Sequence, residues 1–292
     1  MARDTEPDLD TLALAPRANP DLVGHGDAER ELERLYRTGR LPHAILLAGP
    51  RGIGKATLAF RFARFLLAQG AAGGATSPVA GHPDPTGLAV DPQSGVFRRV
   101  AAGGHADLLT VERAWDPRRK RLRGEILVEE AREIAAFFRL TAAEEGWRVV
   151  IVDGAEEMNR NAANAVLKIL EEPPARALLL LVSHNPGRLL PTIRSRCRRF
   201  DLAPLTVILG AALLRRHRAE LAPAEASALA ALSSGSVGRA LELADAGGLD
   251  LYRVLIALLT QTPQVDIGQL HGLADRLARG DADDAYRAGE EL

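Results

Sequence analysis

The sequence predicts an α/β fold: a core built on a parallel sheet with a phosphate-binding loop, followed by a small helical lid and the start of a helical collar domain. Short, continuous apolar runs alternate with helical patterns, which is typical of a parallel sheet covered on both faces. One such run leads through a glycine-rich turn into a helix. No strand pattern follows Arg199, so the remainder is expected to be helical.

The elements of the core follow one another in a regular order. Residues 1–20 carry three prolines and no periodicity, so we expect a loose tail before a core domain at residues 21–203. Apolar spacing predicts helices at the following positions: 27–38, 55–69, 125–140 and 159–172, the last with Asn159 as its N-cap and two prolines as its stop. Continuous apolar runs predict buried strands at the following positions: 43–48, 108–111, 149–152 and 178–182.

Three further segments lie between or beyond these elements. Residues 70–104 are rich in Gly, Ala and Pro, which indicates a long irregular excursion. Residues 204–247 are interpreted as short helices that form the lid domain. Residues 248–292 are helical in pattern and stop without a clear domain end, so we expect a truncated collar domain there.

The composition excludes several classes of protein. The chain has 292 residues, 47% hydrophobic and 26% charged, which is an ordinary globular balance. The one cysteine, Cys197, excludes an intramolecular disulfide and an all-cysteine zinc site. No apolar run reaches the roughly 18 residues of a membrane span, and the acidic start does not resemble a signal peptide, so we expect a cytoplasmic protein. The net charge of −1 argues that any contact with nucleic acid is local.

A glycine-rich turn carries the strongest motif. Residues 49–55 read GPRGIGK, which fits the phosphate loop G-x-x-x-x-G-K, and they stand between a strand and a helix. Glycines let backbone N–H groups converge on a phosphate, and the helix N-terminus adds its dipole. The alternative is a tight turn that binds nothing. We expect a site for ATP or ADP formed by these residues: Gly49, Gly52, Gly54, Lys55, Thr57 and Asp153.

Two parts needed for hydrolysis are missing from this loop and its surroundings. Ala56 stands where a Ser or Thr would bind Mg²⁺, and Thr57 is rotated from that position by about 100°. Asp153 ends a strand and either holds Mg²⁺ through water or caps a helix. Gly154 follows where many ATPases place a glutamate that polarises water. Glu156 and Glu157 are expected at a solvated helix start, so the site is predicted to be degenerate, without the usual Mg²⁺ ligand.

A longer pattern resembles the clamp-loader branch of the AAA+ ATPases. It is carried by residues 161–174, NAANAVLKILEEPP, and by the run Arg194, Ser195, Arg196 and Cys197, within a likeness that covers about residues 20 to 245. The resemblance implies a P-loop AAA+ core in a five-subunit spiral that opens a ring-shaped sliding clamp and closes it on primed DNA. It also implies, as partners, the gamma/tau ATPase and delta subunits of the DNA polymerase III clamp loader, in a nucleoid-associated replisome.

The same resemblance implies a role for one arginine. Arg196 is expected to reach, as an arginine finger, into the ATP site of a neighbouring subunit, where a guanidinium stabilises charge on the phosphoryl group. The chain itself is then a largely non-hydrolysing stator, a rigid arm of the spiral. Spacing alone leaves Arg196 as one of several surface arginines. Any polymerase activity belongs to the whole complex, because nothing in the chain resembles a polymerase active site.

The chain departs from the family pattern in two places. The family often carries a four-cysteine zinc module where residues 70–104 lie, and His82 and His105 alone do not form a zinc site, so we expect no zinc and no other metal site. In active relatives a Gly-Ser pair precedes the arginine of the lid contact to ATP by two residues. Here Arg239 follows Gly235 and Ser236 one place late, which weakens the case for this contact.

Three features keep two interpretations each. Ser183, His184 and Asn185 are sensor residues for a phosphate or simply a polar strand end. A basic run forms a solvated loop or contacts the DNA backbone without reading sequence: Arg118, Arg119, Lys120 and Arg121. Cys197 is expected to be a small apolar residue rather than a nucleophile.

Two other functions compete with the stator. One is an active ATP-hydrolysing clamp-loader or helicase-loader motor, against which Ala56 and Gly154 argue. The other is a small-molecule kinase built on the phosphate loop. A kinase would need a Ser or Thr that binds Mg²⁺, and it would leave residues 161–174 unexplained.

Overall fold

A computed structural model describes residues 15–71, 87–144, 146–260, 268 and 271. The chain clusters into two compact units. The first comprises Met1–Pro50 and Gly54–Leu202, and the second comprises Arg51–Ile53 and Ala203–Leu292. Each unit is described by itself. The division into tail, core, lid and collar stays a prediction.

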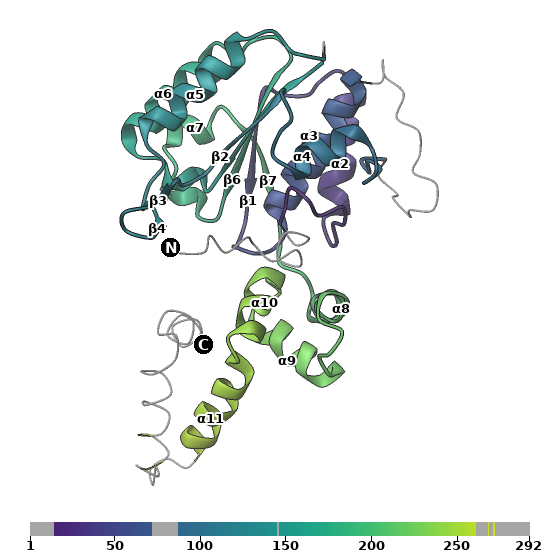
Figure 1. Cartoon of the computed structure of the whole chain (residues 1–292), viewed down its shortest axis with the longest axis vertical. Helices are drawn as coiled ribbons and strands as arrows, with labels where there is room; N and C mark the ends of the chain where they lie inside the picture. The colour runs from purple at the N-terminus through teal and green to yellow at the C-terminus, as the bar shows by residue number, and fades with distance from the viewer. Residues whose placement is uncertain (1–14, 72–86, 145, 261–267, 269–270, 272–292) are drawn as a thin grey trace, which may run out of the picture. The chain divides into compact units, whose positions relative to one another are not determined.

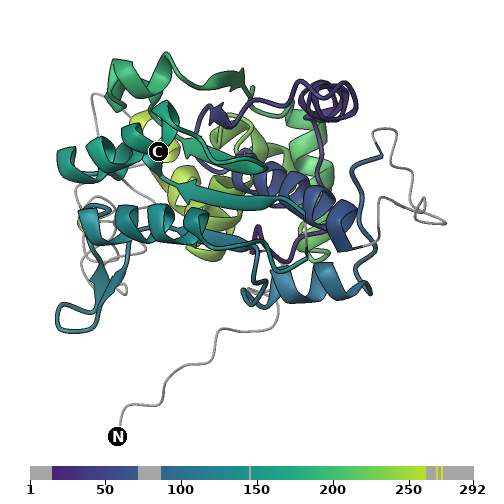
Figure 2. The same cartoon turned by 90° about the horizontal axis from the view of Figure 1, so that it is seen from above.

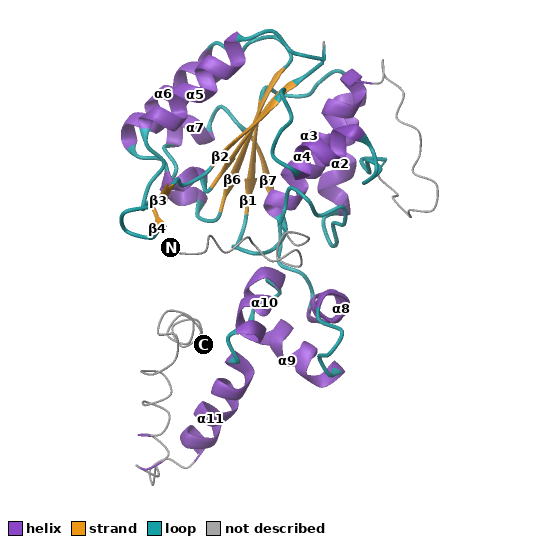
Figure 3. Cartoon of the chain, in the orientation of Figure 1, coloured by secondary structure: helices purple, strands orange, loops and turns teal. Residues whose placement is uncertain are grey.

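The first unit is built on a parallel sheet, as predicted. In the described part of the chain its five strands have the order β2-β5-β6-β1-β7 (Figure 3). Their bounds are β1 Ala44–Ala48, β2 Leu108–Val111, β5 Arg148–Asp153, β6 Ala177–Ser183 and β7 Arg198–Asp201. Leu46 stands opposite Leu181, and Val150 opposite Leu179. Apart from Arg148, Asp153 and Ser183 at strand ends, the central strands are apolar because helices cover both faces of the sheet.

Helices flank the sheet in two layers (Figures 1 and 2). The layer on one face consists of α5 Val128–Arg139, α6 Arg160–Glu171 and α7 Pro191–Arg194. The layer on the other face consists of α2 Gly26–Arg37, α3 Lys55–Ala71 and α4 Gly95–Ala101. Two 3₁₀ turns complete the unit, η1 Ala155–Glu157 and η2 Pro186–Arg188. Strand residues such as Leu46 and Val152 share one buried cluster with Ile134 of α5 and Val166 of α6.

Residues 15–20 are tied to the helix that follows the phosphate loop. Arg64 of α3 donates hydrogen bonds to the carbonyl oxygens of Arg17 (2.9 Å) and Asn19 (2.8 Å). Arg61 donates to the carbonyl oxygen of Pro20 at 2.7 Å and pairs with the buried Glu29 at 2.5 Å. The prediction of a loose tail is therefore wrong for residues 15–20. Residues 1–14 lie outside the described residues.

Two other predictions need correction, and the structure adds detail to a third. Strands do not stop at Arg199, because β7 pairs with β1 at the sheet edge, where Phe200 is buried between exposed polar neighbours. The segment 70–104 is not irregular throughout, since it contains α4, whose N-cap Ser94 accepts a hydrogen bond from the Phe97 amide. The basic run lies on a hairpin of two short strands, β3 Trp115–Asp116 and β4 Arg121–Leu122.

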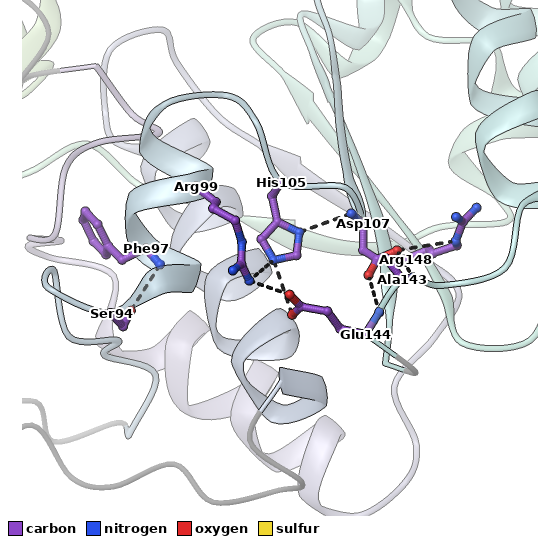
Figure 4. A network of polar contacts seen from close by, with 8 residues as sticks. All are labelled: Ser94, Phe97, Arg99, His105, Asp107, Ala143, Glu144 and Arg148. Carbon is purple, nitrogen blue, oxygen red and sulfur yellow. Dashed lines mark hydrogen bonds and ion pairs between the residues drawn. The ribbon is translucent and has the colours of Figure 1, made fainter.

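A polar network fastens the loop between α5 and β5 to the start of β2 (Figure 4). The buried carboxylate of Asp107 accepts hydrogen bonds from the amides of Ala143 (2.9 Å) and Glu144 (3.1 Å). It also lies 3.8 Å from the guanidinium of Arg148. Burial lowers the pKa of the neighbouring His105, so this ring stays neutral at pH 7. The network therefore holds a loop in place rather than forming an open site.

The second unit is helical in its described part, as predicted. Its helices are α8 Val207–His217, α9 Pro223–Leu232, α10 Val237–Asp245 and α11 Gly248–Thr260. Leu214, Leu229, Leu243 and Leu258, one from each helix, share a single buried cluster. No helix among the residues described is long and apolar enough to cross a membrane.

Candidate functional site

The phosphate loop connects β1, which lies between β6 and the edge strand β7, to α3. Gly49, Gly52 and Gly54 have φ angles of 149°, 73° and 98°. These positive φ angles are readily adopted only by glycine. They let successive backbone N–H groups turn toward one point. α3 begins at Lys55, so its N-terminus stands at the end of the loop. The arrangement is that of a phosphate cradle.

Lys55 lies against the loop that carries it. Its side chain is only 3% exposed, and its ammonium group donates a hydrogen bond to the carbonyl oxygen of Pro50. The ammonium group is therefore held by a carbonyl oxygen of the loop itself. In other P-loops this lysine contacts phosphate oxygens. Thr57 is buried in the first turn of α3, and Ala56 is half-buried. The place of Thr57 in nucleotide binding stays a prediction.

Residues before α2 also reach this loop. A Cβ atom placed on Gly54 would lie 3.3 Å from Cδ1 of Leu22 and 3.5 Å from Nε2 of His25. The sequence did not predict this contact, because Leu22 and His25 belong to a segment without periodicity. The only available signal was the glycine itself, since a buried glycine marks close approach by another part of the chain.

Asp153 is the charged residue that ends β5. Its carboxylate oxygen Oδ1 is buried and has no hydrogen-bond partner in the described ranges. Burial raises the pKa of Asp153 to about 6, Glu112 raises it further, and Lys55 opposes the rise. The helix-capping alternative is wrong, because Gly154 is the N-cap of η1 and Asn159 caps α6. Asp153 is thus an acidic group held at the carboxyl edge of the sheet, where open α/β sheets bind ligands.

These residues fit a phosphate but not the usual magnesium ion of a P-loop. The glycine backbone, the N-terminus of α3 and Lys55 supply the donors that a phosphate needs. Mg²⁺ requires near-octahedral oxygen ligands. Ala56 has no side-chain oxygen to supply one, so the position that follows the P-loop lysine offers no ligand.

Glu156 is a structural bracket, so the prediction of a solvated helix start is wrong for this residue. Its Oε1 accepts hydrogen bonds from the amides of His184 (2.8 Å) and Asn185 (3.1 Å). Burial works to raise the pKa of Glu156, but hydrogen bonds from its own amide and from the His184 amide are the main causes that outweigh burial and lower it. The turn after Asp153 is thereby fixed to the end of β6, where the sequence placed its sensor candidates. Whether these residues sense a phosphate stays a prediction.

Gly154 occupies the position of the missing water-polarising acid, and the side chain of Glu157 lies close to it. Gly154 has φ of +74°, a conformation that favours glycine. Glu157 is turned to an ion pair with Arg113, with 2.8 Å between Nε and Oε2. Gly154 has no carboxylate, and the Glu157 carboxylate beside it is paired with Arg113. The degeneracy of the site stays a prediction.

Arg196 lies just after α7 on the surface of the first unit. Its guanidinium pairs with Oε1 of Glu171 at 3.0 Å and donates to the carbonyl oxygen of Thr192 at 3.1 Å. The side chains of Arg196 and Glu171 are 38% and 53% exposed, so this pair can open without disturbing the core. The neighbouring Arg198 and Arg199 pair with Glu31 and Asp201.

The remaining candidates lie elsewhere on the molecule. The basic run, Arg118 to Arg121, is exposed on the β3–β4 hairpin, and its contact with DNA stays a prediction. Burial raises the pKa of the Cys197 thiol to about 12, which agrees with an inert thiol. In the second unit, Ser236 caps α10 by accepting a hydrogen bond from the Arg239 amide at 3.2 Å.

Within the described ranges no three His, Cys, Asp or Glu side chains gather as metal ligands. His105 belongs to the network around Asp107, and His82 lies outside the described residues. The expectation of no zinc therefore stays a prediction.

Comparisons with known proteins agree on one family. The family model described as DNA polymerase III, delta subunit, matches residues 24–206. The chain is 43% identical to DNA polymerase III subunit delta' of Pseudomonas aeruginosa over 158 residues, which are 53% of this chain and 41% of that protein. It is 34% identical to DNA polymerase III subunit delta' of Escherichia coli over 210 residues, 71% of this chain and 56% of that protein.

A relative with a different name matches over a longer segment. The chain is 30% identical to DNA polymerase III subunit tau of Escherichia coli over 238 residues, which are 79% of this chain and 33% of that protein. The matched segments thus span less than two thirds of the length of each of these relatives.

Proposed function

The chain belongs to the DNA polymerase III, delta subunit, family, a clamp-loader family, and from this premise we propose that it is a delta-prime-type stator of the clamp loader. In this role it hydrolyses little or no ATP, supplies Arg196 in trans to the ATP site of a neighbouring subunit, and helps to load the sliding clamp on primed DNA. Its partners are the gamma/tau ATPase and delta subunits, in a replisome in the cytoplasm.

One observation carries the proposal: both oxygen-bearing side chains needed for hydrolysis are missing beside an otherwise intact phosphate cradle. Ala56 replaces the hydroxyl that binds Mg²⁺, and Gly154 replaces the acid that polarises water. The cradle is compatible with binding of ATP or ADP, whose phosphates would accept hydrogen bonds from the loop amides and Lys55. A nucleotide held there without hydrolysis would stiffen the core rather than drive its movement.

The position of Arg196 supports its role as the arginine finger. It follows directly after the short helix α7, and both of its contacts, with Glu171 and Thr192, fix the root and direction of the side chain. An exposed ion pair of this kind is worth about 0.2–1 kcal/mol. A phosphoryl group of a neighbouring subunit, with its higher charge, can therefore displace Glu171 at little expense in free energy.

Single-turnover ATP hydrolysis by the reconstituted complex tests the finger. Arg196→Ala should slow hydrolysis at the site it completes by about 10³-fold or more, and Arg196→Lys should not restore it, because an ammonium lacks the planar fork of donors. Arg199→Ala is the matched control, since Arg199 is exposed on the following strand and pairs with Asp201. Equal rates in the wild-type and Arg196→Ala complexes would reject the proposal.

The alternative of an active motor is kept because the tau subunit of Escherichia coli matches over 79% of this chain. Steady-state ATP hydrolysis by the purified chain, alone and with primed DNA, separates the two functions. The stator should show no turnover above background. Clear turnover that is lost in Lys55→Ala would establish a motor and overturn the proposal.

A further inference from the structure

The hairpin between β2 and α5 exposes a large aromatic side chain. Trp115 is 58% exposed, and Leu122, its direct partner across the two strands, is 48% exposed. Because directly paired residues lie on one face of a hairpin, these two side chains form a small apolar platform. The hairpin stands off from the sheet and its helices in both views (Figures 1 and 2). Neither side chain belongs to a buried cluster of the described residues.

Positive charge surrounds this platform. Residues 115–123 hold five basic side chains and one acidic side chain, in a chain whose net charge is −1. All five basic residues are exposed: Arg118, Arg119, Lys120, Arg121 and Arg123. The acidic residue, Asp116, accepts hydrogen bonds from the amides of Arg118 (2.9 Å) and Arg119 (3.2 Å), so it is used to shape the turn.

The charges at the tip are largely available to a partner. Arg119 lies 4.0 Å from Asp116, and Arg123 lies 3.5 Å from Glu130. Among the described residues, Arg118, Lys120 and Arg121 make no ion pair with any acidic side chain. Lys120 has φ of +50°, so a non-glycine residue adopts a left-handed conformation at the turn. Three cations thus point into solvent beside an exposed indole.

We propose that the β3–β4 hairpin binds single-stranded DNA, with an unpaired base stacked on Trp115 and the phosphates on either side held by Arg118, Lys120 and Arg121. Proteins that bind single strands combine basic residues that follow the backbone with aromatic side chains on which bases stack. A base inside a duplex is already stacked on its neighbours, so Trp115 favours the unpaired template beyond a primer. This site deepens the DNA contact in the proposed function and rests on it.

Binding of fluorescently labelled oligo(dT) of about 16 nucleotides to the full chain, followed by anisotropy, tests the site. Trp115→Ala should weaken binding by about 5- to 100-fold, whereas Trp115→Phe, which retains a stacking ring, should stay within about threefold of wild type. The double variant Arg118→Ala/Arg121→Ala should also lower the slope of log K against log salt by about 0.7 for each phosphate contact removed.

One matched control and one spectroscopic variant separate stacking on Trp115 from general effects on DNA binding. Arg139→Ala removes an exposed arginine at the far end of α5 and should leave binding unchanged. Trp147→Phe removes the only other tryptophan of the chain, so the remaining emission comes from Trp115 and should be quenched as oligo(dT) binds. Circular dichroism spectra that overlay confirm that each variant is folded.

Each outcome either supports the proposed site on the hairpin or overturns it. Loss of binding in Trp115→Ala with retention in Trp115→Phe supports the site. Binding that is unchanged in Trp115→Ala, equal binding to duplex and single strand, or no binding at low salt overturns it. Binding to vesicles that contain anionic lipid, with none to oligo(dT), also overturns it. The assay needs no partner subunit and no ATP, so its failure leaves the result for Arg196 untouched.

Discussion

Replacing Asp153 with asparagine should stabilise the first unit at neutral pH. Burial raises the pKa of Asp153 to about 6 from an ordinary value of 3.8, even with Lys55 nearby. The folded protein therefore holds the proton of this carboxyl group more tightly than the unfolded chain does. Stability must fall as the pH rises from about 4 to about 6, and it stays lower above that range, because ionised Asp153 is disfavoured only in the folded state.

The magnitude follows from the size of the shift. A rise of about two pKa units corresponds to roughly 3 kcal/mol at 1.36 kcal/mol per unit. Asparagine resembles the protonated form in shape and charge. Asp153→Asn should therefore match the wild type near pH 4 and exceed its free energy of unfolding by about 3 kcal/mol at pH 8. Glu112→Gln, which removes the charge that adds to the effect of burial, should narrow this difference.

Urea unfolding followed by tryptophan fluorescence measures the effect. Both tryptophans, Trp115 and Trp147, belong to the first unit, so the signal reports this unit alone. Asp201→Asn is the matched control, because Asp201 also ends a strand of the sheet but is exposed, and it should change stability by less than about 0.5 kcal/mol. The reasoning fails if Asp153→Asn is less stable than wild type at pH 8, or if the difference does not grow between pH 4 and pH 7.

Three further substitutions have defined outcomes. Arg61→Met should lower the free energy of unfolding of the first unit by about 3–5 kcal/mol, because it leaves Glu29 buried without its ion-pair partner. Adding Glu29→Leu should recover most of this loss in urea unfolding. Losses of the two single variants that simply add in the double variant would contradict this. Glu156→Ala should lower the free energy of unfolding by about 3 kcal/mol at pH 7. Because the pKa of Glu156 is lowered in the folded state, this difference from wild type should shrink as the pH falls below about 4.5. A difference that does not change with pH would contradict the role of the Glu156 carboxylate. Asp107→Asn should speed amide hydrogen exchange at residues 143 and 144, and unchanged exchange there would show that the carboxylate does not hold this loop.

The inner strands and the edge strand β2 could be predicted from the sequence, whereas the edge strand β7 and the β3–β4 hairpin could not. Runs such as residues 149–152 and 178–182 are apolar because helices cover both faces, so the strands are recognisable without any partner. The edge strand β7 reads Arg198, Arg199, Phe200 and Asp201, with one buried residue in four, and this pattern does not differ from a loop. The strands of the β3–β4 hairpin have two residues each, too few for any periodicity.

The candidate site shows the same limit. The glycine spacing of the phosphate loop is local, so the loop, Lys55 and the absence of an oxygen at Ala56 were predictable. The bracket from Glu156 to the amides of His184 and Asn185 joins residues 28 and 29 positions apart. Nothing at Glu156 itself indicates such a partner. Its carboxylate was assigned to solvent because charged residues after a strand usually lie there.

The left-handed glycine after Asp153 has a consequence for how a hydrolytic site could be regained. A glutamate at position 154 would have to adopt φ near +74°, which disfavours every side chain. Its Cβ would lie 2.6 Å from Oε2 of Glu157, which is engaged with Arg113. A single substitution would therefore strain the turn before it restored an acid. The backbone at this turn therefore opposes the return of an acid at position 154, and the Glu157 carboxylate would have to move away to make room for it.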